Sequence, residues 1–203
     1  MVGFTPKNIS TYKVWGNQTP NSEDTVWDDL RVSLETTRRG AANAPGFQKV
    51  NDDGSGSVGV YATLFSKSTR EDVFFSVQFS HDWQTGSDIE PHVHWMPTDT
   101  DTGTVRWGLE YCWVDINGTY SNTTIIYDED PADGTALKHQ YASFGLITPP
   151  SHITGVSSMM MCRLFRDATH ANDDYDADAA GLEFDIHYQR NSVGSRKMHS
   201  KGD

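Results

Sequence analysis

One stretch near the middle of the chain alternates between large apolar residues and smaller or polar ones. Its apolar members occupy every second position, at Trp107, Leu109, Tyr111 and Trp113. Side chains of a β-strand point alternately to the two faces of a sheet, whereas those of a helix repeat every 3.6 residues. The pattern therefore predicts a strand whose apolar face lies in a core and whose other face carries Arg106, Gly108, Glu110 and Cys112.

Similar strand-like segments recur along the chain, and no stretch has a convincing helical period. They cover residues 26–34, 58–65, 72–79, 89–95, 105–113, 119–127, 138–148, 157–165 and 182–188. The core face of the last segment is expected to carry Leu182, Phe184, Ile186 and Tyr188. The turn-rich stretch 38–56 is predicted to be a loop, and the short polar connection 98–103 predicts a hairpin between its flanking strands.

These segments predict an all-β fold, an antiparallel β-sandwich of jelly-roll type. The chain has 203 residues with 6 Trp, 8 Tyr and 9 Phe, enough for one core of ordinary size. We expect an extended N-terminal arm in residues 1–24, a single sandwich domain in 25–190 and a mobile C-terminal tail in 191–203. The residues expected to contact other chains are Tyr12, Val14 and Trp15 in the arm and Arg196 and Lys197 in the tail.

The charge of the chain argues against two classes of partner. The formal net charge is −12, which repels nucleic-acid backbones and anionic membranes. No apolar run reaches the length of a membrane span, and the N-terminus lacks the pattern of a signal peptide. Cys112 and Cys162 are expected to be buried free thiols of a protein made in a reducing cytoplasm, with one disulfide between adjacent strands as the alternative.

The stretch from residue 89 to 95 contains a His-x-His pair, His92 and His94, that should share one face of a strand. Imidazoles two residues apart can bind a transition metal, with Asp185 or His187 as a third ligand. The pair loosely resembles the first motif of the cupin jelly roll, although Glu90 precedes the histidines here instead of following them. We expect the histidines to be hydrogen-bonded on the strand face or at an interface, and we expect no metal or cofactor; the metal-ligand candidates are His92, His94 and His187.

Other catalytic signatures are missing from the sequence. There is no Gly-x-Ser-x-Gly elbow, no phosphate-binding glycine loop and no dinucleotide fingerprint. The acidic stretches 99–103 and 174–178 lack the terminal bidentate acid of a calcium loop and are expected to be solvated. We therefore expect no catalytic residue and no enzymatic activity.

Four stretches together resemble tailed-phage virion proteins that are encoded in structural gene clusters. The stretches are 88–95, 107–111, 158–167 and 184–196, so the resemblance covers about residues 60–196. It implies a virion protein made in the host cytoplasm, such as a capsid cement or decoration protein that binds and stabilises the head shell. The implied partners are the major capsid protein or other virion proteins, with a homodimer or homotrimer and no nucleic acid or membrane.

Two other functions remain open at the level of sequence. One is a cupin-like metal-dependent enzyme that uses His92 and His94. The other is a carbohydrate-binding module of a head or tail fibre, in which exposed Trp or Tyr rings stack on sugars.

Overall fold

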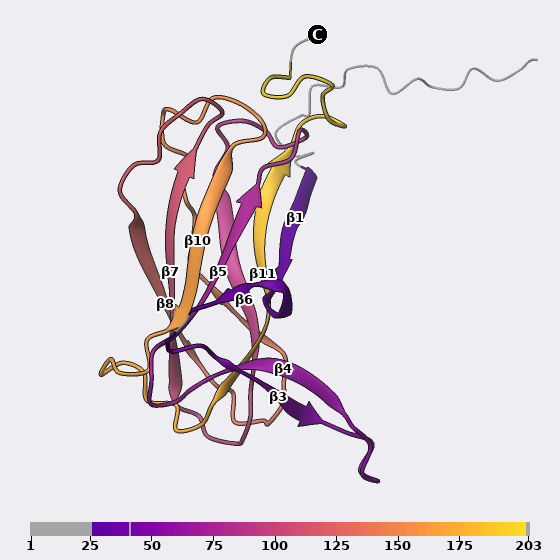
Figure 1. The fold of residues 1–203 in the computed structure, drawn as a ribbon, viewed down its shortest axis with the longest axis vertical. Helices are drawn as coiled ribbons and strands as arrows, with labels where there is room; N and C mark the ends of the chain where they lie inside the picture. Colours follow the sequence, from indigo (N-terminus) through magenta and orange to yellow (C-terminus); the bar gives the residue numbers. More distant parts are fainter. Residues whose placement is uncertain (1–25, 41, 202–203) are drawn as a thin grey trace, which may run out of the picture.

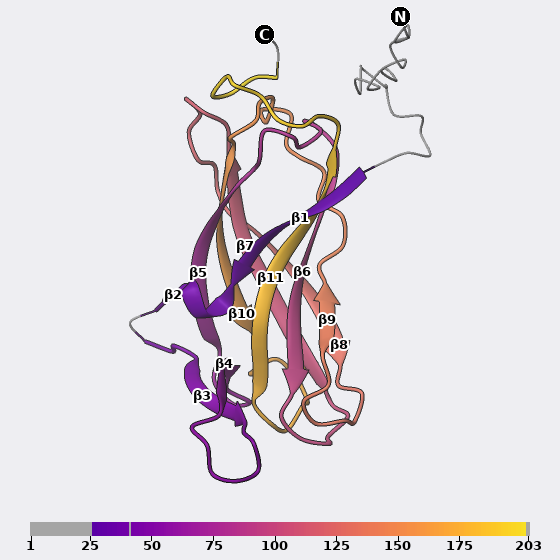
Figure 2. The same cartoon turned by 90° about the vertical axis from the view of Figure 1, so that its right-hand side faces the viewer.

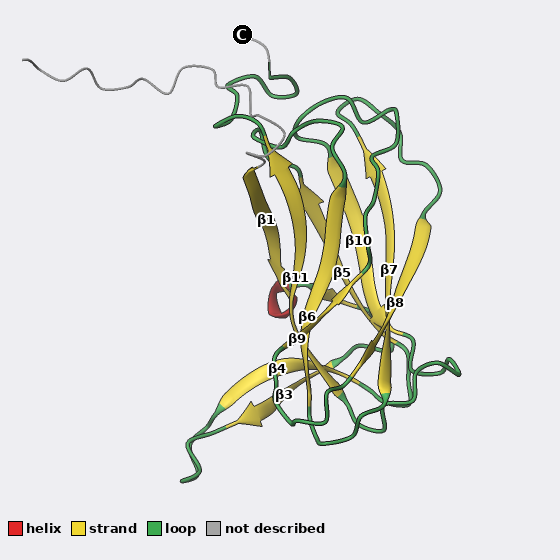
Figure 3. Cartoon of the chain, turned by 180° about the vertical axis from the view of Figure 1, so that it is seen from behind, coloured by secondary structure: helices red, strands yellow, loops and turns green. Residues whose placement is uncertain are grey.

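The computed structural model describes residues 26–40 and 42–201, which form two facing antiparallel sheets (Figure 1). The six-stranded sheet consists of β1 Val26–Ser33, β3 Gly46–Asn51, β4 Val60–Phe65, β6 Ile89–Pro97, β9 Gln140–Ser143 and β11 Ala179–Arg190. The five-stranded sheet consists of β2 Arg38–Arg39, β5 Glu71–Gln78, β7 Thr104–Val114, β8 Thr124–Pro131 and β10 Met159–Arg166. Among the described residues, the only helical segment is the short 3-10 turn η1 Leu34–Thr36, drawn red in Figure 3.

The order of the strands is that of a jelly-roll-type sandwich. The six-stranded sheet runs β3-β4-β11-β6-β9, with β1 also paired to β11, and the five-stranded sheet runs β2-β5-β10-β7-β8. The chain changes sheet at every connection between strands except those of the β3–β4 and β7–β8 hairpins. The predicted all-β antiparallel sandwich is therefore confirmed.

The predicted pairing of the strands on either side of residues 98–103 is wrong. β6 and β7 lie in opposite sheets, so this connection crosses the sandwich instead of closing a hairpin. The reason is that both strands have an apolar face for the same core, where the rings of Trp95 and Trp107 lie 6.2 Å apart between centroids. β7 instead pairs with β8, across a turn in which Asn117 has a positive φ of 65°.

The prediction of a loop in residues 38–56 is also wrong, because this stretch contains β2 and β3. β3 is an edge strand that pairs with β4 through its backbone, and most of its side chains are exposed. A strand that buries little of either face shows no apolar alternation, so its sequence resembles that of a loop.

The core lies between the two sheets and is rich in tryptophan. Its largest buried side chains include Trp83, Trp95, Trp107 and Trp113, each at most 2% exposed. On β7 the predicted apolar face is in this core, with Tyr111 only half-buried. On β11 the predicted face is confirmed for Phe184, Ile186 and Tyr188.

Leu182 is the exception on β11. A bulge between Gly181 and Glu183 shifts the register, so Leu182 packs instead with a second cluster formed by Ala62, Leu64 and Ala180. The bulge therefore reverses the face that the alternation predicts for this residue.

The described part of the C-terminal segment contacts the turn after β5. Ser195 O lies 2.8 Å from His81 Nδ1, and Lys201 Nζ donates to Asp82 O at 3.1 Å. Cys112 and Cys162 are both free thiols. Within residues 26–40 and 42–201, no helix is long and apolar enough to cross a membrane.

Candidate functional site

The histidine pair lies on the outer face of the six-stranded sheet, where Figure 2 shows β1, β11, β6 and β9 side by side. Val93 and Trp95 of β6 are fully buried in the core, so the alternating His92 and His94 point to the opposite face. β6 pairs with β11 so that His92 lies directly opposite Asp185. The sheet register thus brings together residues that are more than 90 positions apart in the chain.

A cavity of about 470 Å³ opens on this face, and we call it the histidine cavity. Its lining residues come from four neighbouring strands: Asp29, Glu90, His92, His94, Tyr141, Ser143, Asp185 and His187. Two exposed aromatic rings mark its two sides. Trp27 lies beside His187, with 6.5 Å between ring centroids, and Tyr141 lies 6.0 Å from His92.

Three polar atoms meet at the bottom of the histidine cavity. His94 Nε2 lies 3.2 Å from His92 Nε2 and 3.1 Å from Asp185 Oδ2. His92 Nε2 is 3.6 Å from the same carboxylate oxygen. His92 and Asp185 are buried and His94 is half-buried, so these atoms are largely shielded from solvent.

The second nitrogen of each imidazole faces another acceptor. His94 Nδ1 lies 2.7 Å from His139 Nε2, and His92 Nδ1 lies 3.5 Å from the carbonyl oxygen of Glu90. These contacts orient both rings with their Nε2 atoms toward Asp185. The arrangement presents two imidazole nitrogens and one carboxylate oxygen to a single point, a donor set that can bind a transition-metal ion.

The electrostatics of the cluster favour a negative Asp185. Burial alone would raise the pKa of the Asp185 carboxyl, but hydrogen bonds and charge from His92 and His94 hold the pKa below its ordinary value. Burial lowers the pKa of His94, and the neighbouring His92 and His139 oppose its protonation further. For His92, burial lowers the pKa, but the hydrogen bond and charge of Asp185 outweigh it and raise the pKa overall.

Of the three metal-ligand candidates predicted from the sequence, the structure brings only two together. His92 and His94 lie together with Asp185, whereas His187 Nε2 lies 2.7 Å from Asp29 Oδ1. Its ring is 5.0 Å from that of His92 between centroids, so it borders the cluster without joining it.

Sequence reasoning did not identify Tyr141 and His139 as neighbours of the site. They lie in or next to β9, which has only four residues and therefore has too few positions to show an alternating pattern. Arg196 and Lys197 are exposed in the C-terminal segment, and Tyr12, Val14 and Trp15 lie outside the described residues.

The two acidic stretches, 99–103 and 174–178, form hydrogen bonds with each other's loop. Asp101 Oδ2 accepts the backbone N–H of Asp176, and Asp174 Oδ1 accepts that of Thr104. Asp99 Oδ1 accepts the hydroxyl of Tyr175. These carboxylates hold the loop before β7 against the loop before β11.

No family model matches the sequence, and no curated protein matches it. Among solved structures, a family 35 carbohydrate-binding module from Cellvibrio japonicus is similar with a TM-score of 0.43 and 9% identity, over 81% of this chain and 99% of that one. A family 35 module from Clostridium thermocellum gives a TM-score of 0.44 and 11% identity, over 77% of this chain and 97% of that one. A structure of the infectious bursal disease virus Gx strain is similar with a TM-score of 0.39 and 11% identity, over 95% of this chain and 37% of that one. Such distant similarities carry no conclusion about function.

Proposed function

We propose that the protein is a non-catalytic structural component of a tailed-phage particle, a cement or decoration protein that binds the head shell. The resemblance described above supports this proposal. Its four stretches correspond to β6, β7, β10 and β11, which are inner strands of the two sheets. The single structural observation that carries the proposal is the β3–β4 hairpin.

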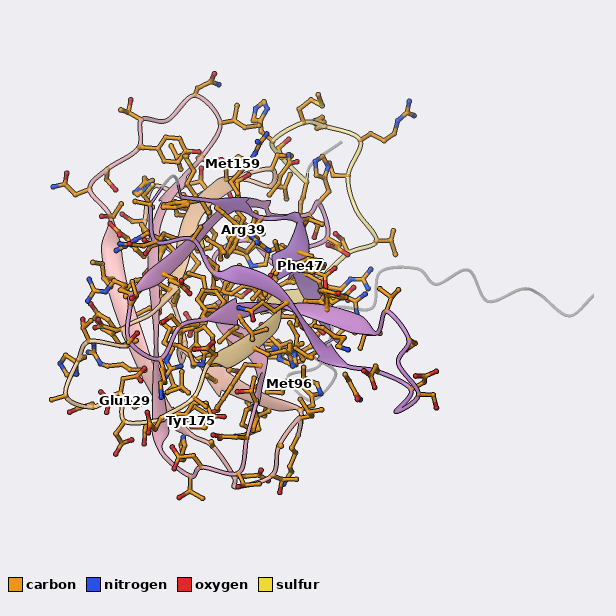
Figure 4. All side chains as sticks on the ribbon, turned by 60° about the horizontal axis from the view of Figure 1, so that its bottom comes forward. Arg39, Phe47, Met96, Glu129, Met159 and Tyr175 are labelled. Atoms are coloured by element: carbon orange, nitrogen blue, oxygen red, sulfur yellow. The ribbon has the colours of Figure 1, made fainter. Side chains whose placement is uncertain are left out.

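The β3–β4 hairpin projects away from the body of the sandwich (Figure 1). Apolar side chains are exposed along it and at its turn: Phe47, Val58, Val60 and Tyr61. The rings of Phe47 and Tyr61 contact each other at 5.4 Å between centroids. The guanidinium of Arg39 lies 5.8 Å from the Phe47 ring, and Figure 4 labels both of these residues. Exposed apolar groups gathered on one projecting element favour contact with another protein chain.

The base of the hairpin is firmly attached to the sandwich. Ala62 and Leu64 of β4 are buried in the second cluster, and Phe65 is fully buried in the main core. The exposed half of the hairpin is therefore held in a fixed position before any partner binds, which lowers the entropic cost of binding. We propose the major capsid protein as this partner, with further contacts from the N-terminal arm and from Arg196 and Lys197.

The hairpin contact is testable with particles that were assembled without this protein. Wild-type protein and the Phe47→Ser/Tyr61→Ser double variant are mixed with the particles, and co-sedimentation on a gradient measures the bound fraction. We expect the double variant to bind about 10-fold more weakly or worse, because aromatic anchors dominate such interfaces. Tyr120→Ser, which changes an exposed tyrosine of the β7–β8 connection, is the matched control and should bind like the wild type. Equal binding by the double variant would argue against the hairpin contact.

A second candidate function, carbohydrate binding, is favoured by the rings beside the histidine cavity. Trp27 and Tyr141 are exposed on opposite sides of it, and the carboxylates of Asp29 and Glu90 line its interior. Flat aromatic surfaces beside hydrogen-bonding groups suit the apolar faces and hydroxyls of sugars. A glycan array tests this candidate function. Tyr141→Ala should abolish binding to any glycan that the wild type binds, whereas Tyr120→Ala should bind that glycan like the wild type. An array without any bound glycan would remove this candidate.

A further inference from the structure

We propose that His92, His94 and Asp185 form a binding site for one divalent transition-metal ion of the Zn²⁺ type. This inference goes beyond the structural role proposed above and does not depend on it. It rests on the positions of three ligand atoms, on a buried oxygen that has no hydrogen-bond partner among the described residues, and on the contacts that orient the two imidazoles.

The spacing of the three ligand atoms fits a single tetrahedral ion. A tetrahedral zinc ion has ligands about 2.0–2.1 Å away, which places neighbouring ligand atoms about 3.3 Å from one another. The three separations in the cluster are 3.1, 3.2 and 3.6 Å. One ion can therefore contact His92 Nε2, His94 Nε2 and Asp185 Oδ2 together without any movement of β6 against β11.

Hydrogen bonds alone leave the polar atoms of the cluster incompletely satisfied. His94 Nε2 can offer either one proton or one lone pair, but it faces both His92 Nε2 and Asp185 Oδ2. In addition, Asp185 Oδ1 is buried and finds no hydrogen-bond partner among the described residues. A buried carboxylate oxygen without a partner costs free energy, and a bound cation removes that cost.

The groups behind the two imidazoles orient them as metal ligands. Imidazoles that bind a metal through one nitrogen usually donate the N–H of the other to a nearby acceptor. Here His94 Nδ1 faces His139 Nε2 at 2.7 Å, and His92 Nδ1 faces the Glu90 carbonyl oxygen at 3.5 Å. Both rings are thus oriented so that an Nδ1–H can donate outward while Nε2 keeps its lone pair for the ion.

The donor set selects the class of ion. Two imidazole nitrogens and one carboxylate suit Zn²⁺, Co²⁺, Ni²⁺ and Cu²⁺, whereas Ca²⁺ and Mg²⁺ prefer oxygen ligands. The remaining carboxylates of the cavity have other partners, since Asp29 pairs with His187 and Glu90 accepts the hydroxyl of Ser143 at 2.9 Å. Three protein ligands beside an open cavity leave the ion a free position for water or another small ligand.

Calorimetric titration of the chelator-treated full-length protein with ZnCl₂ tests the site. We expect the wild type to bind one Zn²⁺ per chain, and Asp185→Asn and His94→Gln each to weaken binding by more than about 100-fold. His139→Gln should weaken it less, by about 10-fold to 100-fold, because this residue only orients His94. His187→Gln is the matched control: it changes a histidine that borders the cavity but does not belong to the cluster, and it should bind like the wild type.

Two further measurements make the result decisive. Thermal melts in chelator show whether each variant still folds, and Asn is nearly isosteric with Asp, so Asp185→Asn should still fold. Titration with Co²⁺ should give the visible absorption of a tetrahedral cobalt site in the wild type and not in Asp185→Asn. The proposal is overturned if the folded wild type binds no Zn²⁺, if folded Asp185→Asn binds it equally well, or if His187→Gln loses as much affinity as His94→Gln. Binding to particles is measured independently of Zn²⁺ binding, so a failure of one proposal leaves the other unaffected.

Discussion

Arg166 and Asp173 form an ion pair that is enclosed by protein on all sides. Arg166 Nη2 lies 2.8 Å from Asp173 Oδ1, and the two side chains are 0% and 1% exposed. The guanidinium also donates to the carbonyl oxygens of Tyr175 and Ala177, both at 2.7 Å. This single side chain therefore holds the aspartate-rich loop between β10 and β11 against the end of the sandwich.

Removing the negative partner of this pair should strongly destabilise the protein. Asp173→Asn leaves the guanidinium charge buried without compensation, which typically costs about 3–5 kcal/mol in the free energy of unfolding. Urea unfolding measures the loss. The control is Asp176→Asn, which removes an exposed ion pair with Lys67 and should cost less than about 1 kcal/mol. Similar losses in the two variants would contradict the enclosed geometry.

Phe184 of β11 tests the assignment of the core face. Its side chain is fully buried, and its ring lies 4.8 Å from that of Phe75 on the opposite sheet, measured between centroids. Phe184→Ala should lower the free energy of unfolding by about 3–5 kcal/mol, because it leaves a cavity between the sheets. A loss below about 1 kcal/mol in denaturant unfolding would mean that this face does not lie in the core.

Asp130 should make the stability depend on pH. Burial raises the pKa of its carboxyl to about 6, and the nearby Asp128 adds to the effect, whereas the hydrogen bond from Trp95 Nε1 opposes it. The folded state thus binds this proton more tightly than the unfolded state does. The free energy of unfolding should therefore fall as the pH rises from about 4 to about 6, and then this contribution should level off.

The variant Asp130→Asn isolates this contribution, since its amide oxygen can still accept the Trp95 N–H. Thermal melts between pH 4 and pH 7 should show the variant gaining stability relative to the wild type as the pH rises. A difference between the two proteins that does not change with pH would rule out Asp130 as the source.

The sequence predicts most of the sandwich because one buried face produces alternation. Trp107, Leu109 and Trp113 identify β7, and Phe184 and Ile186 identify β11. The failures have separate physical causes. β3 buries few of its side chains, so it shows no alternation. The bulge at Leu182 turns this side chain to the other face of the sheet without any change in the residue pattern, and the pairing partner of β6 depends on contacts between residues far apart in the chain.

The candidate site was only half predictable. Alternation places His92 and His94 on one face, because they are two residues apart on one strand. The choice between Asp185 and His187 as the third group depends on the register between β6 and β11, which pairs His92 with Asp185 and Glu90 with His187. A different register would place another residue beside His92, although the alternating pattern of each strand would fit a sheet equally well.

The most direct test of the proposed role is to count this chain in purified particles. Quantitative mass spectrometry with isotope-labelled peptides gives its copy number relative to the major capsid protein. A cement protein that binds repeated sites on a symmetric shell should be present in a fixed, simple ratio to that protein. Absence from the particles, or only a few copies per particle, would contradict the account.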